Sequence, residues 1–159
     1  MAIGVVTRRL VRTIETGLAE ATWPVSAASQ AELASRSEPR IEVLLWRVEP
    51  DPATQGAISL DARRPARPVS AVILHYLVVV AGNEPASAQD VLGRCMRVLA
   101  ATPVLTQNAS APDEALLEGQ TLQVAVEALD TATMLALWHA LAVPLRLSAA
   151  YTVRGLQVV

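Results

Sequence analysis

The sequence predicts an α+β fold of two layers, in which helices pack on one face of a mainly antiparallel or mixed sheet of about four strands. Two observations support this prediction. Segments with strand alternation and segments with helical spacing follow one another in the order helix, strand, strand, helix, strand, helix, strand. The chain also has 159 residues, 52% of them hydrophobic. We therefore expect one domain over residues 1–159 with a core of its own.

The first half of the chain predicts one helix and one strand before the longest strand. Residues 3–20 repeat apolar side chains at helical spacing, and Trp23-Pro24 ends this helix. Residues 41–49 are predicted as a strand. The segments before and after it, 26–39 and 50–68, are predicted as loops, the first with at most a weak helical turn. The polar side of the helix is predicted to consist of Arg8, Arg9, Arg12 and Glu15.

Residues 69–81 form the longest predicted strand, and this strand is apolar on both faces. Such a strand is either central, with both faces covered, or buried against a neighbouring subunit. His75 and Tyr76 interrupt its aliphatic run, and as neighbours in a strand they point to opposite faces. We expect a buried His75 hydrogen-bonded to a carbonyl, with Tyr76 packed on the other side.

A helix is predicted from Ser87 to Ala101. Ser87 and Asp90 approximate a capping box at its start. Cys95 lies on the apolar stripe and is expected to behave as a small hydrophobe. Gly93 in mid-helix costs about 1 kcal/mol relative to alanine, which indicates close approach of another backbone.

The last third of the chain predicts strand, helix, strand. Residues 121–129 alternate as a strand, and a short helix capped by Asp130 or Thr131 follows and ends before Pro144. The final strand spans 145–159, with a bulge at Gly155. The inward side of the first of these strands is predicted to consist of Leu122, Val124, Val126 and Ala128.

Charge and composition exclude several classes of function. The net charge is −2, and the basic clusters at 7–12 and 63–67 lack interleaved aromatic residues, so no nucleic-acid partner is predicted. A single cysteine excludes an internal disulfide framework and suits a reducing cytosol. Neither a signal peptide nor a run of about 20 apolar residues occurs, so we expect a soluble cytoplasmic protein without a membrane span.

No pattern of residues predicts catalysis, a cofactor or a metal site. A zinc site from His75, Cys95 and His139 would need three remote elements to converge, without the short ligand spacing typical of zinc. Nucleotide-binding glycine loops and paired carboxylates are also missing. We predict a protein that is not an enzyme; a small ligand-binding or enzymatic domain centred on His75 is the less favoured alternative. The expected markers of the structural core are His75, Tyr76, Gly93, Trp138 and Tyr151.

Eight residues are candidates for a subunit or partner interface. The arginines among them are suited to pairing with acidic patches on a partner. The final strand is a candidate for addition either to its own sheet or to that of a neighbouring subunit. The candidates are Arg8, Arg12, Arg63, Arg64, Arg67, Arg154, Leu156 and Val158.

Three blocks of sequence, at 43–53, 74–105 and 129–158, resemble a known family when read together. They resemble the N-terminal domain of the cap, or tail-terminator, proteins of bacterial contractile injection systems, which are phage-tail-like particles. The matching motifs are Leu74-His75-Tyr76-Leu77, Leu92-Gly93-Arg94, Thr102-Pro103-Val104-Leu105, Leu137-Trp138 and Ser148-Ala149-Ala150-Tyr151.

The resemblance implies a tail-terminator-like fold and a structural role. It implies a homohexamer that terminates the inner tube and the sheath at the end distal to the baseplate, with the tube protein and the sheath protein as partners. Such a particle would be assembled in the bacterial cytoplasm. Head-to-tail contacts close a ring, and growth stops when the outer axial face is not self-complementary. The alternative is an adaptor ring or the terminator of a non-contractile tail.

Overall fold

A computed structural model describes residues 2–18, 23–35, 39–54, 70–105, 117 and 119–158. Its strands form one six-stranded sheet in the order β1-β2-β3-β6-β5-β4. In chain order, the elements are α1 (Ala2–Gly17), β1 (Val25–Ala27), α2 (Gln30–Ser35), β2 (Arg40–Pro50), the 3₁₀ turn η1 (Pro52–Thr54), β3 (Ser70–Ala81), α3 (Pro85–Ala101), β4 (Val104–Leu105), β5 (Leu122–Glu127), α4 (Thr131–Leu141) and β6 (Leu147–Val158).

The sheet has more strands than the sequence predicts. The four predicted strands correspond to β2, β3, β5 and β6, which pair antiparallel where they are neighbours. Two short strands extend the two edges: β1 pairs parallel with β2, and β4 pairs antiparallel with β5. The sheet is therefore mixed. Strands of two or three residues are too short to show an alternating pattern, which is why the prediction of about four strands missed them.

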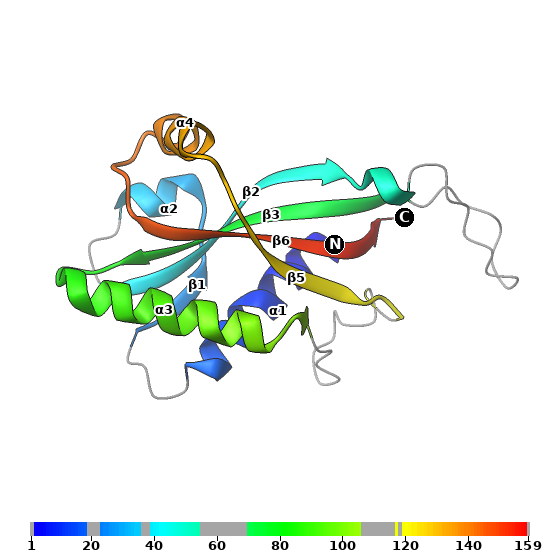
Figure 1. The fold of residues 1–159 in the computed structure, drawn as a ribbon, viewed down its shortest axis with the longest axis horizontal. Coiled ribbons are helices and arrows are strands. Elements are labelled where there is room, and N and C mark those ends of the chain that lie inside the picture. The colour runs from blue at the N-terminus through cyan, green and yellow to red at the C-terminus, as the bar shows by residue number, and fades with distance from the viewer. Residues whose placement is uncertain are drawn as a thin grey trace, which may run out of the picture.

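Helices cover both faces of the sheet, so the expectation that they pack on one face is wrong. α1 and α3 lie below the sheet in Figure 1, whereas α2 and α4 lie above it. The side chains of β3 alternate between the two layers. Tyr76 and Val78 belong to the core under α1 and α3, and Leu77 and Val79 pack with Trp138 of α4. β3 is apolar on both faces because it is central and both of its sides are covered.

The helices α1 and α3 differ from the prediction in two details. Arg9 is buried instead of lying on the polar side of α1. α3 begins at Pro85, and its N-cap is Glu84 instead of Ser87. The Glu84 carboxylate accepts hydrogen bonds from the backbone N–H groups of Ala86 (3.1 Å) and Ser87 (2.7 Å). Proline suits the first helical position because its missing N–H would have no partner there.

The last third of the chain follows the predicted order of elements. Asp130 caps α4, as expected. The bulge at Gly155 is confirmed, because the β3–β6 register shifts there and Gly155 has a φ of +94°. Only the first half of the predicted inward side of β5 is buried. Leu122 and Val124 are buried, but Val126 is 66% exposed, and Ala128 lies exposed beyond the end of the strand.

Candidate functional site

His75 is the centre of a polar cluster on the face of the sheet that also carries α4. Its Nδ1 lies 3.0 Å from both carboxylate oxygens of Glu127, and its Nε2 lies 3.0 Å from Oε1 of Glu49. The ring of Trp46 packs edge-on against the imidazole, with 5.6 Å between ring centroids. Only 4% of His75 is exposed. The expectation that His75 is hydrogen-bonded to a carbonyl is therefore wrong, because its partners are two carboxylates.

The local backbone explains how these groups meet. Trp46 is an extra residue in β2, because Leu45 pairs with Tyr76 and Arg47 pairs with the next residue of β3, His75. This bulge turns Arg47 and Glu49 toward the face that His75 occupies. The Arg47 guanidinium donates to the Glu49 carboxylate. Glu127 reaches His75 from the last residue of β5, with β6 between their strands.

The geometry of the cluster suits a structural role. A general base needs a free ring nitrogen within reach of the proton that it removes. Both nitrogens of His75 face carboxylates, so the cluster ties β2, β3 and β5 together. No group of three or more ligands that could hold a metal occurs among the described residues.

Tyr76 lies on the opposite face of β3 from His75, as predicted for neighbours in a strand. Its hydroxyl lies 2.9 Å from Oγ1 of Thr7 on α1. Burial raises the pKa of Tyr76 to about 12, and the hydrogen bond with Thr7 offsets part of that rise. The tyrosine therefore stays neutral and anchors α1 to the sheet.

A second buried group of charges, which the sequence patterns do not predict, joins β2 to the segment before β6. Glu42 is fully buried, with its Oε1 2.6 Å from Nε of Arg40 and its Oε2 3.7 Å from Nη1 of Arg146. An ion pair in the interior adds little net stability, but removal of one partner leaves a costly unpaired charge. The available signal was a glutamate within an otherwise apolar strand start, Ile41-Glu42-Val43.

The residues predicted to mark the core do not share one environment. His75, Tyr76, Trp138 and Tyr151 are buried. Gly93 is exposed, and a Cβ placed on it would meet nothing within 4 Å among the described residues. The close approach expected at Gly93 is therefore not made within the described part of this chain, and its place in the core was predicted wrongly.

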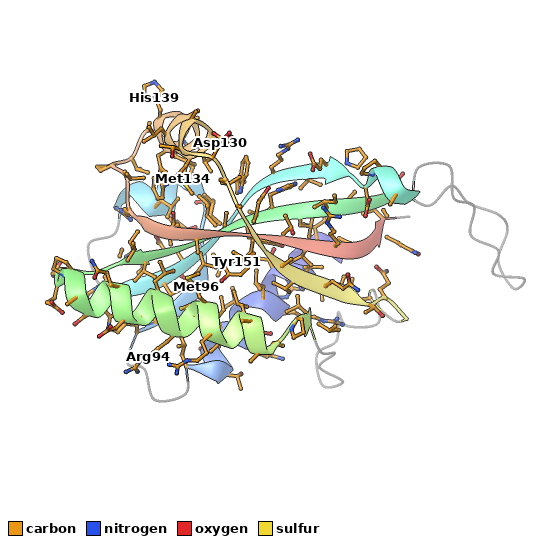
Figure 2. The ribbon with its side chains drawn as sticks, in the orientation of Figure 1. Arg94, Met96, Asp130, Met134, His139 and Tyr151 are labelled. Carbon is orange, nitrogen blue, oxygen red and sulfur yellow. The ribbon has the colours of Figure 1, made fainter. Side chains whose placement is uncertain are left out.

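The histidines and the cysteine considered as zinc ligands lie apart. Cys95 is buried in the core that contains α1 and α3, and burial raises the pKa of its thiol to about 11. His139 is exposed on α4 and points away from the sheet (Figure 2). His75 lies in the polar cluster on the face opposite Cys95. The three side chains do not form a common site.

The interface candidates also occupy different environments. Arg8 and Arg12 are exposed on α1, and Arg154 and Val158 are exposed on β6. Leu156 is fully buried in the core and is corrected from interface to core residue. β6 lies between β3 and β5, so its strand addition is to its own sheet and not to a neighbour's. Arg63, Arg64 and Arg67 lie outside the described residues.

Comparison with protein families gives a match along almost the whole chain. The family model described as the Pvc16 N-terminal domain matches residues 5–158. The chain belongs to this family. The match takes in the three sequence blocks that resemble cap proteins of contractile injection systems. No curated relative matches the sequence at a significant level.

Two solved structures share the fold of this Pvc16 N-terminal domain. One is a cryo-EM structure of the sheath/tube terminator of the extracellular contractile injection system PVC in its extended state, with 16% identity and a TM-score of 0.61 over 95% of this chain. The other is a cryo-EM structure of the tube-terminating cap of the anti-feeding prophage, with 18% identity and a TM-score of 0.64 over 97% of this chain. The chain spans 56% and 54% of their lengths.

No helix within the described ranges combines the length and the apolar character that a membrane crossing requires.

Proposed function

We propose that the chain is a subunit of a cap that terminates the inner tube and the sheath of a contractile injection particle. The cap is a closed homohexameric ring at the end distal to the baseplate, and its partners are the tube protein and the sheath protein. Assembly takes place in the bacterial cytoplasm. The main support is the family match over residues 5–158, together with a fold shared with two terminators over nearly the whole chain.

The arrangement of side chains supports a structural role over a catalytic one. Both nitrogens of His75 are engaged by carboxylates, the single cysteine is buried, and the exposed surface includes apolar residues on α3, α4 and β5. Exposed apolar residues of this kind would be covered where subunits associate. In a ring, head-to-tail contacts close on themselves, and the outer axial face offers no site for a further tube subunit.

Deletion of the coding sequence tests this function. Particles from the deletion strain should carry tubes and sheaths of widely varying length, because nothing stops subunit addition. Negative-stain electron microscopy of purified particles gives the length distribution, and complementation with the wild-type chain should restore a uniform length. Uniform particles of normal length in the deletion strain would contradict the proposed function. Binding of the purified chain to a baseplate component, and not to tube or sheath protein, would favour an adaptor ring instead.

A further inference from the structure

The outward side of α4 is an apolar surface without a partner in the described structure. The helix contains no Asp, Glu, Lys or Arg, and its inward side is made by Trp138, Leu141 and their neighbours. Leu135 on the outward side is 53% exposed. A helix that is apolar on all sides is normally buried on all sides. The exposed residues of α4 are Thr131, Ala132, Thr133, Leu135, Ala136, His139 and Ala140.

A second exposed surface lies on α3, on the other face of the sheet, where small and apolar residues are bordered by Asp90 and Arg97. Gly93, Met96 and Ala100 are exposed and share one side of the helix, since they are three and four residues apart. Met96 is 40% exposed. Glycine in mid-helix costs about 1 kcal/mol relative to alanine, and nothing among the described residues approaches Gly93. The position is therefore suited to close approach by a helix from another molecule.

We propose that α4 of one copy packs against the Gly93 side of α3 in the next copy, and that this contact repeats around the ring. The proposal deepens the proposed function and rests on it. The two surfaces lie on opposite faces of one sheet (Figure 1), so a single copy cannot join them. Two different surfaces that fit each other give a head-to-tail contact, which is the kind that generates rings.

The charged and polar side chains at the two helices favour an antiparallel arrangement. α4 has Asp130 at its start and His139 in its last turn, whereas α3 has Asp90 in its first half and Arg97 in its second. Antiparallel packing places Asp130 beside Arg97 of the next copy and His139 beside its Asp90. Asp130 and His139 are separated by about 13 Å along α4, and Asp90 and Arg97 by about 10 Å along α3, at ~1.5 Å per residue. These two separations are similar enough for both contacts to form together. Parallel packing would instead bring the two aspartates together.

Small side chains allow the helices to approach closely. A flat stripe of alanines recurs every four residues along α4, at Ala132, Ala136 and Ala140. In the proposed contact this stripe faces Gly93 of the next copy, which has no side chain to keep the helices apart. Helix axes then approach to the lower end of the usual range of about 8–10 Å. Two further apolar side chains are exposed outside the two helices: Val126, 66% exposed on β5, and Leu145, 61% exposed four residues after α4. A stable contact buries about 800 Å² per partner, which is more than one short helix offers. The contact between copies must therefore include exposed residues outside the two helices.

Two arginine substitutions test the contact, because each lies in open surface and leaves the fold intact. Ala136→Arg blocks the α4 surface and Gly93→Arg blocks the α3 surface, while Thr16→Arg, exposed on α1, serves as the matched control. Light scattering after size exclusion gives the mass, and circular dichroism gives the Tm. We expect rings from the wild type and the control, and monomers with a native circular-dichroism spectrum from the two variants, as the dissociation constant of the ring rises by about tenfold or more.

Mixing the two variants gives the sharper result. A mixture of Ala136→Arg and Gly93→Arg retains one intact pair of surfaces, so it should form a heterodimer that neither variant forms alone. Charge reversal adds a second test: Asp90→Arg should weaken the ring, and Asp90→Arg with His139→Asp should restore it.

The outcomes separate this contact from the proposed function. Rings that persist in Ala136→Arg overturn the contact and leave the cap function standing. Intact rings of Ala136→Arg that no longer bind tube protein overturn it as well, because the α4 surface then serves the tube. A mixture that stays monomeric also overturns it. A wild-type chain that is monomeric at all concentrations overturns both the contact and the ring.

Discussion

His75 shows how a residue that resembles a catalytic group can serve the fold. Its neighbours in space, Glu49 and Glu127, come from β2 and β5, so they lie 26 and 52 residues away in the sequence. A strand pattern predicts that His75 is buried, but it does not predict which side chains lie opposite. The partners depend on the bulge at Trp46, and a bulge without glycine leaves no clear signal in a single sequence.

Replacement of His75 by alanine should destabilise the chain. The change removes the side chain that contacts both carboxylates and leaves them without this hydrogen-bond partner, so we expect a loss of about 1–3 kcal/mol in the free energy of unfolding. Urea denaturation at neutral pH measures the loss. Gln123→Ala, an exposed residue of β5, is the control and should change stability by less than about 0.5 kcal/mol. Unchanged stability of His75→Ala, with loss of a measurable activity, would contradict the structural role.

Other single residues show where sequence patterns succeed and fail. The burial of Tyr76, Trp138 and Tyr151 follows from aromatic side chains placed within apolar segments. Leu156 was assigned to an interface, but the extra residue at the Gly155 bulge turns its side chain into the core. Periodicity reports the face of a strand only up to the next bulge.

At the scale of elements, the long segments were predictable and the short ones were not. α1, α3, α4, β2, β3, β5 and β6 each contain enough residues to show a helical or alternating pattern. β1 and β4 do not, and the six-residue α2 was expected as at most a weak turn. The layer to which α2 and α4 belong was also missed, although β3 is apolar on both faces and requires cover on each of them.

The backbone of β6 requires a glycine at Gly155, near the end of the strand. Its φ of +94° strains any other residue, and an added Cβ would lie 2.1 Å from the carbonyl oxygen of Thr121. Gly155→Ala should therefore destabilise the chain by about 1–3 kcal/mol. Gly93→Ala is the matched control, because its Cβ meets nothing among the described residues, and it should stabilise the dissociated chain by up to about 1 kcal/mol. Thermal unfolding of dilute protein measures both changes, and equal Tm values would contradict the strain at Gly155.

At the scale of the whole molecule, the helices on the two faces of the sheet carry exposed apolar residues that nothing within the described part of one copy covers. Helices on both faces bury the core, while Met96 on α3 and Leu135 on α4 stay exposed. Residues that serve an interface look like core residues in a sequence, since both are apolar. The family resemblance in three sequence blocks predicted the assembly role, whereas composition and periodicity showed no pattern of catalytic residues and named no function.

The central claim is that copies of this chain close into a ring that seats on the end of a tube. Cryo-EM of the purified chain mixed with the tube protein tests it most directly. We expect closed six-membered rings attached to one end of each tube, with no tube subunits beyond them. Tubes that bear no ring, or that bind single copies along their sides, would contradict the account.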